Sequence, residues 1–342
     1  MNTYHYINID GSMGEGGGQV LRTALALSAC LHQPLKIHHI RANRKKPGLM
    51  RQHLTAVLAA AKICGAEVSG AELDSQQIEF VPGKIQAGEY YFSIGTAGST
   101  TLVLQTIILP LLFAEGASNV VIEGGTHNPL APPFDFLHYS YLPLLERMGA
   151  KIHARLLRPG FFPVGDGCIE VQVEPIKKLH PISLLERGEI LNREAHILLS
   201  QLPQHIGERE AKIIEQRLDW PAGGIAIEHV ETARSPGNAV SIIISCEHIT
   251  NVFAGIGQKG VKAETVANRV ADDVRYYLAG DAPVDQHLAD QLVLPMALAG
   301  GGEFVTTSPT LHTLTNIAVI EKFCEPRFKV EPVDKKKFRI RI

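Results

Sequence analysis

Apolar residues at helical spacing and at strand-like spacing follow one another along this chain in an order that recurs three times. Each copy has an apolar helix, a short strand, a loop, a second helix and a closing strand. In the first copy the pattern predicts a helix from about Gln19, a strand over 35–40 and a helix that stops at Gly65. In the second copy it predicts a helix over 99–113, a strand from Val120, and a helix from Phe134 to Gly149. Both second helices end in Gly-Ala, which fits a left-handed glycine after the last turn.

The third copy follows only after a long gap. Its predicted elements are a helix over 290–298, a strand over 303–307, a helix over 311–323 and a strand over 327–330. The gap, 181–282, is more charged and carries its own helices and strands. We interpret it as a small inserted α/β domain, with 1–180 and 283–342 forming the large domain of an α/β (α+β) fold. On its first helix we expect Glu208, Arg209 and Glu210 to face solvent.

Composition narrows the function only slightly. The chain has 342 residues, 45% hydrophobic and 20% charged, which is typical of a globular protein. Its net charge of -2 means that a nucleic-acid partner needs a local basic patch. The five cysteines are scattered, which argues against disulfides or a zinc site, and fits a reducing cytoplasm. We expect neither a secretion signal in the first six residues nor a membrane segment.

A glycine-rich turn over 10–22, Asp-Gly-Ser-Met-Gly-Glu-Gly-Gly-Gly-Gln-Val-Leu-Arg, launches the first helix. Glycines and a helix N-terminus together favour phosphate binding through backbone N–H groups. Glu15 would repel a bare phosphate but suits a metal that carries one, and Arg22 can return to the same anion. The turn lacks the glycine of a dinucleotide fingerprint at Gln19 and the lysine of a P-loop at Gly17. A glycine-rich hairpin without a ligand is the alternative.

A basic segment over 41–53 follows the first copy's strand. Its cations, and the helix start at its end, suit a polyanion such as a phosphate-ended nucleic acid. A solvated basic loop is the alternative. The side chains that we expect to take part are Arg41, Arg44, Arg51, Gln52 and His53.

Two kinds of residue are candidates for a nucleophile. Lys45 and Lys62 each fit the short Lys-x-x-Gly pattern of transferases that form a lysyl-AMP, but that pattern is common by chance. His312 falls in the first turn of a helix that Ser308 or Thr310 can cap. There the helix dipole disfavours imidazolium, so the neutral, nucleophilic imidazole is expected beside a phosphate-binding helix end. The alternative is a histidine that merely satisfies its hydrogen bonds beside the core.

Five ordered motifs together strongly resemble the RNA 3'-terminal phosphate cyclases. They are Gly-x-x-Gly-Glu-Gly-Gly-Gly-Gln-x-Leu-Arg at 11–22, Lys-Pro-Gly-Leu-x-Arg-Gln-His-Leu at 46–54, Gly-Gly-Thr-x-Asn-Pro at 124–129, Leu-Ala-Asp-Gln-Leu at 288–292 and Pro-Thr-x-His-x-x-Thr-Asn at 309–316. The likeness covers nearly the whole chain. It implies three repeated two-helix, four-strand units and a small inserted domain, in agreement with the periodicity.

The resemblance also implies an ATP-dependent reaction. A histidine attacks the α-phosphate to give a histidyl-AMP, AMP passes to an RNA 3'-phosphate, and the ribose 2'-OH then closes a 2',3'-cyclic phosphate. Adenylylation is chemically sensible because cyclisation then expels AMP rather than hydroxide. Charge moves among phosphoryl oxygens at each step, so positioning, cations and a divalent metal are the expected tools.

By position, the resemblance makes His312 the adenylylated histidine and Glu15 the acid associated with a divalent metal, Mg or Mn. Residues implied to contact the nucleotide are Gln105, Pro132, His287, Leu288, Ala289, Asp290 and Gln291. Those implied around ATP phosphates or the RNA end are Arg22, Arg41, Arg44, Arg51, Gln52 and His53. His287 departs from the family, which commonly has a tyrosine there that stacks on adenine. The smaller imidazole is expected to weaken that stacking.

Two other functions compete with this one. A non-enzymatic RNA-processing scaffold would not need His312, and an enolpyruvyl transferase would not need the Pro-Thr-x-His motif. The expected partner is RNA with a 3'-phosphate end, and no membrane association is expected. The sequence leaves the oligomeric state open, with a homodimer among the possibilities.

Overall fold

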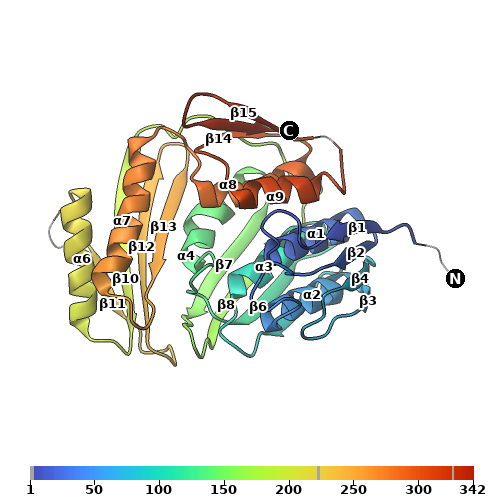
Figure 1. Ribbon diagram of the computed structural model, residues 1–342, viewed down its shortest axis with the longest axis horizontal. Helices are drawn as coiled ribbons and strands as arrows, with labels where there is room; N and C mark the ends of the chain where they lie inside the picture. The colour runs from blue at the N-terminus through green and yellow to red at the C-terminus, as the bar shows by residue number, and fades with distance from the viewer. Residues whose placement is uncertain (1–3, 222–223, 326) are drawn as a thin grey trace.

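The computed structural model describes residues 4–221, 224–325 and 327–342. The expectation about the chain's first six residues rests partly on Met1, Asn2 and Thr3, which lie outside the described residues. Figure 1 shows helices packed among the β-sheets, with the C-terminal helices α8 and α9 beside the N-terminal helix α1. None of the helices in the described part of the chain combines the length and apolar character needed to cross a membrane.

The described residues form four sheets, and three of these share one strand order, which confirms the repeats. The first sheet runs β1 (Ile7–Asp10), β2 (Leu35–His38), β4 (Ile78–Val81), β3 (Glu67–Ser69). The second runs β5 (Glu89–Ser93), β6 (Ser118–Gly124), β8 (Gly167–Glu174), β7 (Lys151–Arg158). The third, taken from its other edge, runs β9 (Ser183–Leu184), β14 (Glu303–Thr306), β16 (Phe338–Arg341), β15 (Lys329–Pro332). In each, the first two strands are parallel and the other pairs antiparallel.

Each repeat contributes helices in equivalent places. The helices before the second strand are α1 (Gly18–Leu31), α3 (Thr100–Leu112) and α8 (Gln286–Ala299). Those after it are α2 (Arg51–Cys64), the composite of α4 (Phe134–Phe136), the π-helical turn η1 (Leu137–Tyr141) and α5 (Leu142–Arg147), and α9 (Leu311–Ile320). The expected glycine stops are present, since Gly65 has φ 57° and Gly149 has φ 97°.

The third repeat begins earlier than the periodicity predicts. Its first strand, β9, lies within the segment interpreted as inserted, and it pairs with β14 of the third sheet. With two residues, it is too short to produce a pattern of alternation. The inserted elements therefore interrupt the third repeat between its first strand and its first helix.

The inserted elements form the fourth sheet and two helices. The sheet runs β11 (Ala226–His229), β10 (Ile190–Ser200), β12 (Gly237–Cys246), β13 (Thr250–Ile256). Helices α6 (Gln204–Leu218) and α7 (Ala263–Ala279) pack together against one face (Figure 1). On β12, Ile242 belongs to this domain's own core, whereas its neighbour Ile243 packs into the main core. Burial on both faces explains why nearly every position of β12 is buried and why most of its side chains are apolar.

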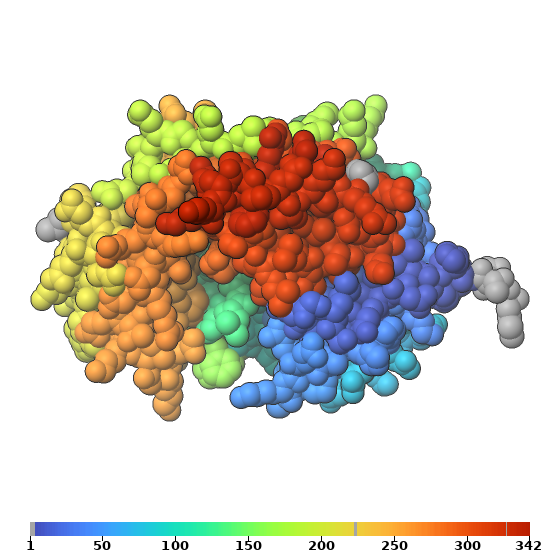
Figure 2. All heavy atoms as spheres, turned by 45° about the horizontal axis from the view of Figure 1, so that its top comes forward, coloured from blue at the N-terminus to red at the C-terminus, as the bar shows by residue number. Residues whose placement is uncertain are grey.

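Packing of helices from different repeats brings the two ends of the chain together. Helix α1 contacts α9, and α9 contacts α8. In Figure 2 the C-terminal segment lies directly against the N-terminal one, with the inserted domain on its other side. Apolar side chains of α1 such as Leu25 and Leu27 are fully buried, which fixes this arrangement. The starts of α1 and α9, which carry the glycine turn and His312, consequently meet.

Candidate active site

Two helix N-termini face each other at the candidate site. Helix α1 begins after Gly17, and α9 begins after Thr310, whose hydroxyl accepts the amide of Thr313 at 3.0 Å. The expectation that Thr310 caps this helix is thus confirmed. Gln19 and His312 both lie in the first turn of their helices. Unpaired N–H groups and two positive dipole ends therefore converge on one place, which favours an anion.

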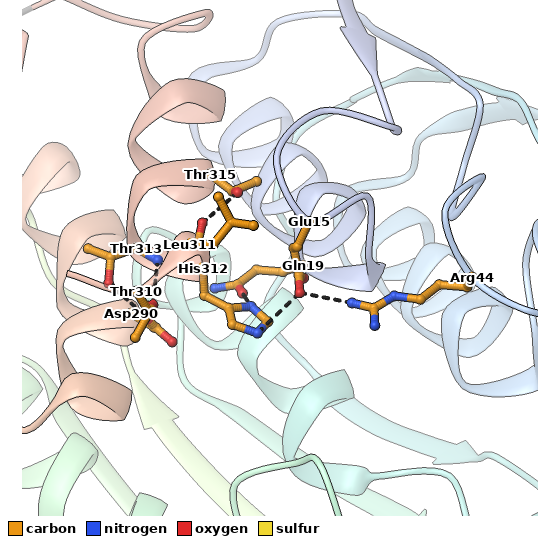
Figure 3. Close-up of polar contacts among 9 residues, drawn as sticks. All are labelled: Glu15, Gln19, Arg44, Asp290, Thr310, Leu311, His312, Thr313 and Thr315. Carbon is orange, nitrogen blue, oxygen red and sulfur yellow. Dashed lines mark hydrogen bonds and ion pairs between the residues drawn. The ribbon is translucent and has the colours of Figure 1, made fainter. Parts of the chain in front are cut away.

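His312 bridges the two ends of the chain (Figure 3). Its Nδ1 lies 2.7 Å from Oε1 of Gln19, and its Nε2 lies 3.1 Å from Oε2 of Glu15. A glutamine oxygen only accepts, so Nδ1 carries a proton and donates it to Gln19. Nε2 is then the nitrogen whose protonation can change, and it points at the glycine turn.

The surroundings of His312 act against the effect of the helix dipole on its charge. The hydrogen bond that His312 donates to Glu15, aided by the negative charge of Glu15, raises the pKa of His312, although partial burial opposes this. The sequence-based expectation of a neutral imidazole considered only the helix dipole. A carboxylate in direct contact outweighs that dipole, so the folded protein shifts the equilibrium of His312 towards the protonated form.

Glu15 is held by cations on several sides. Its Oε2 lies 2.8 Å from a guanidinium nitrogen of Arg44 as well as beside His312. Burial by itself would raise the pKa of Glu15, but the hydrogen bond and charge of His312, with the charges of Arg44 and Arg22, lower it overall. Glu15 is therefore ionised at neutral pH.

Close packing around the turn explains two of its glycines. A Cβ at Gly17 would lie 2.4 Å from Oε1 of Glu15 and 2.6 Å from a guanidinium nitrogen of Arg44. A Cβ at Gly18 would lie 2.5 Å from Nε2 of His53 and 2.8 Å from a guanidinium nitrogen of Arg22. Any larger residue would displace these side chains, so the glycines make room for a polar cluster.

His53 and Arg22 sit deeper in this cluster. Burial, with the nearby charges of Arg22 and Arg41, lowers the pKa of His53 to about 3, so its imidazole is neutral. Burial likewise lowers the pKa of Arg22 to about 10, and Arg22 stays charged. Nδ1 of His53 is buried without a hydrogen-bond partner. An orphaned polar atom beside an arginine indicates a place for a ligand.

Other members of the basic segment have partners within the protein. Arg41 donates from one nitrogen to the carbonyl oxygens of Lys46 and Gly48, each at 2.8 Å, and so closes its own loop. Oε1 of Gln52 accepts the amide of Ser99, the cap of α3. The remaining member, Arg51, is exposed at the first position of α2, towards Gly95 rather than His312.

Asp290 supports the start of α9. It is 7% exposed, and its Oδ1 accepts the hydroxyls of Thr310, at 2.6 Å, and Thr313. Asn316 donates to the backbone oxygen of Asp290 at 2.8 Å and accepts the hydroxyl of Thr23 at 2.7 Å. These contacts tie α8, α9 and α1 together, so Asp290 acts here through the helix that presents His312.

Within the described part of the chain, the hydrogen bond and ion pair of His312 go to Gln19 and Glu15 rather than to the remaining residues implied for the nucleotide. Leu288 and Ala289 have fully buried side chains in the main core. Gln291 is partly buried, and the carbonyl of Pro132 accepts the hydroxyl of Thr101. Nε2 of Gln105 is buried without a partner, as Nδ1 of His53 is. Gln105 therefore offers one further atom that a ligand would satisfy.

His287 is exposed beside aromatic residues from the inserted domain. The same small cavity is lined by Phe253, Tyr276 and Tyr277, and Tyr276 is 56% exposed. Sequence reasoning did not single out these rings, which come from the inserted elements. Their aromatic character alone does not distinguish them from core residues.

Sequence reasoning also missed Gln19, although it is part of a quoted motif. The available signal was helical spacing, because Glu15, Gln19 and Arg22 lie at four- and three-residue intervals around the start of α1. A residue that fixes a tautomer is recognisable only once its partner is known.

The donors at the site fit an oxygen-preferring cation only in part. Glu15 offers a carboxylate and Gln19 a carbonyl oxygen, which is the kind of small protein contribution that Mg²⁺ accepts when phosphates complete its shell. Among the described residues no set of three His, Cys, Asp or Glu ligands surrounds this point. A metal here would therefore need oxygens from a phosphorylated substrate.

Comparisons with known proteins agree with the resemblance. The family model described as RNA 3'-terminal phosphate cyclase matches residues 13–330. A protein of that name from Salmonella typhimurium is 50% identical over 328 residues, covering 96% of each chain. Proteins of the same name from Koribacter versatilis and Pseudomonas fluorescens are 49% and 48% identical, covering 95% and 98% of this chain and 91% and 97% of theirs.

Proposed function

The chain belongs to the RNA 3'-terminal phosphate cyclase family, and on that premise we propose that it converts an RNA 3'-phosphate to a 2',3'-cyclic phosphate with ATP. The observation that carries this proposal is His312 between Gln19 and Glu15 at two facing helix N-termini. A scaffold does not require this arrangement. An enolpyruvyl transferase has no use for a nucleophilic histidine held in this way.

His312 is the proposed nucleophile, and Nε2 is its attacking atom. Gln19 accepts a hydrogen bond from the Nδ1–H group, which fixes the tautomer and the ring orientation. Nε2 must lose its proton and its contact with Glu15 before its lone pair reaches the α-phosphorus of ATP. Attack forms the N–P bond of a histidyl-AMP and breaks the bond to pyrophosphate, which leaves with the electron pair.

The later steps transfer the same activated group. A 3'-phosphate oxygen of RNA displaces His312 and takes AMP, which forms a phosphoanhydride. The 2'-hydroxyl then attacks the terminal phosphorus of the RNA and loses its proton, while AMP departs. AMP is a far better leaving group than hydroxide, and this is the chemical reason for spending ATP.

Cations of the chain are placed to hold the anionic groups. Arg22 and Arg44 flank Glu15, and neutral His53 lies beside Arg22. Guanidinium groups bind phosphate oxygens in bidentate fashion. Glu15 and Gln19 would hold a divalent Mg or Mn, whose chemistry would be to neutralise charge on the phosphates of ATP.

The test is covalent labelling with ATP that carries ³²P at the α-position. The wild type should retain label through an acid-labile, alkali-resistant phosphoramidate, and His312→Ala should retain none. His153→Ala, an exposed histidine on β7, is the matched control and should label normally. Label that persists on His312→Ala would overturn this mechanism.

RNA ends provide the second readout of the same experiment. With a 3'-phosphorylated oligonucleotide, the wild type should release AMP and give a terminus that resists phosphatase. His312→Ala should leave the phosphate removable. If it still forms the cyclic end at the wild-type rate, the proposed nucleophile is wrong.

A further inference from the structure

Asp10, His38 and His39 lie together at the end of the first sheet. Asp10 closes β1 and His38 closes β2, and the two residues are paired in the parallel register. Consecutive residues of a strand normally point to opposite faces. His39 instead has φ 54°, in the left-handed region, and its Nδ1 lies near Asp10. An uncommon backbone conformation for a non-glycine residue thus brings both imidazoles to one carboxylate.

The three donor atoms are spaced as the ligands of one metal ion are. The two Nδ1 atoms are 3.1 Å apart, and they lie 3.9 Å and 3.2 Å from Oδ1 of Asp10. Bonds of about 2.0–2.1 Å at tetrahedral angles put two ligands roughly 3.3–3.4 Å apart. The observed separations bracket that value, so only small side-chain adjustments are needed.

Hydrogen bonds from Ser12 orient the carboxylate of this cluster. The amide and hydroxyl of Ser12 both donate to Oδ1 of Asp10, at 2.9 and 2.7 Å. These two bonds hold the carboxylate in place beside the imidazoles. Two ring nitrogens that face each other can share only one hydrogen, whereas a cation would satisfy both lone pairs and the carboxylate.

We infer that Asp10, His38 and His39 bind one borderline transition-metal ion, such as Zn²⁺, with water in the fourth position. Two imidazoles and a carboxylate suit Zn²⁺, Co²⁺ or Ni²⁺, whereas Mg²⁺ prefers an all-oxygen shell. The side chains are 40–61% exposed, which leaves an entry path and room for water. Such an ion is chemically distinct from a phosphate-bound Mg²⁺ at Glu15.

The position of this site gives the ion a structural effect. Asp10 opens the glycine turn, and His39 precedes the basic loop. Farther along, Asn43 donates to the carbonyl of Ser12 at 3.1 Å, and Arg44 pairs with Glu15 at 2.8 Å. The same two loops are thus already joined at their far ends. A metal at their roots would brace the pair and stabilise the folded chain by mass action.

The affinity for Zn²⁺ tests the inference directly. The full-length chain, freed of metal and kept reduced, is titrated with Zn²⁺ by calorimetry in excess Mg²⁺. We expect Asp10→Asn and His39→Ala each to weaken this site at least about tenfold. His153→Ala and Glu15→Gln are the controls and should bind as the wild type does. Equal affinity in the ligand variants, or its loss in Glu15→Gln, would overturn the inference.

Co²⁺ supplies a readout that does not depend on affinity. Its visible absorption should be of the intense four-coordinate type in the wild type and weak in Asp10→Asn, which preserves the shape of the side chain. Zn²⁺ should raise the Tm of the wild type but not that of His39→Ala, and the metal-free Tm of each variant checks its folding. A six-coordinate spectrum, or thiolate bands from cysteine, would rule out the proposed ligands.

Discussion

Glu15 at the candidate site and Glu210 inside the inserted domain are two partly or fully buried carboxylates with opposite behaviour. Burial disfavours the charge of both. Around Glu15, His312 and Arg44 outweigh burial, and its pKa falls. Glu210 is 0% exposed, receives one hydrogen bond of 2.8 Å from Asn238, and leaves Oε1 without a partner. Its pKa rises to about 7, chiefly because of burial.

The difference shows that cations, rather than burial, distinguish the candidate reaction site. A carboxylate that is kept charged beside a histidine can control a proton, because its charge changes the pKa of that histidine. A carboxylate that is neutralised by burial can only accept or donate local hydrogen bonds. Perturbed ionisation by itself therefore does not locate chemistry in this molecule.

The largest expected effect is on the rate of protein adenylylation, when Glu15 and Glu210 are each replaced by glutamine and the two variants are compared. Glu15→Gln should slow protein adenylylation by about a hundredfold, because it removes the carboxylate that meets both His312 and the proposed metal. Glu210→Gln, the matched change in the other region, should leave the rate within about twofold of wild type. Single-turnover labelling with ATP measures both.

Two control measurements are needed to interpret the rates of these variants. Circular dichroism and Tm confirm that each variant is folded, and a metal titration shows whether Glu15→Gln needs more Mg²⁺ or Mn²⁺. If Glu15→Gln adenylylates at the wild-type rate, or if Glu210→Gln loses as much of the rate, the two carboxylates do not differ in function as we propose.

For the pH dependence of stability, in contrast to the adenylylation rate, we expect Glu210 to matter. The folded state raises the pKa of Glu210 from 4.5 to about 7, so it favours the protonated form. Its contribution to the free energy of unfolding is up to about 3 kcal/mol. This contribution is fully present below about pH 4.5, declines as pH rises, and is lost above about pH 7. Glu210→Gln should remove this decline. Urea unfolding between pH 5 and pH 8 measures it.

The neighbouring Glu208, exposed on the same helix, provides the control. Glu208→Gln should keep the wild-type pH dependence, apart from small surface effects. If Glu210→Gln loses stability between pH 5 and pH 8 as steeply as the wild type, Glu210 is not the group that titrates.

The comparison also shows what sequence patterns can predict. The prediction that Glu210 faces solvent was wrong, although Glu208 and Arg209 are exposed as expected. The pattern of an amphipathic helix predicts burial well at the centre of each face. At a boundary position such as 210, whether the side chain is buried depends on what packs against it. Here that neighbour is Asn238 on β12, which no local pattern reveals.

Repeats were predictable because long helices have strong apolar periodicity. The two-residue β9 was not, since its place in the third sheet depends on pairing with β14. The residue types at the site were likewise visible in motifs. The contact between Glu15 and His312 joins residues almost three hundred positions apart, and only the packing of α1 on α9 creates it.

The smallest expected effect is a shift in the pKa of His312. Glu15 raises the pKa of this imidazole through a hydrogen bond and its charge, so Glu15→Gln should lower it. Because Nε2 attacks only when unprotonated, labelling by the wild type should accelerate as pH rises through that pKa. In Glu15→Gln the acid limb should move to lower pH, even though the maximum rate is reduced. NMR titration of the imidazole measures the shift directly, with Glu210→Gln as the control that leaves it unchanged. A pKa that stays the same in Glu15→Gln would mean that the carboxylate does not hold this proton, and that the charge difference between the two regions has no bearing on the nucleophile.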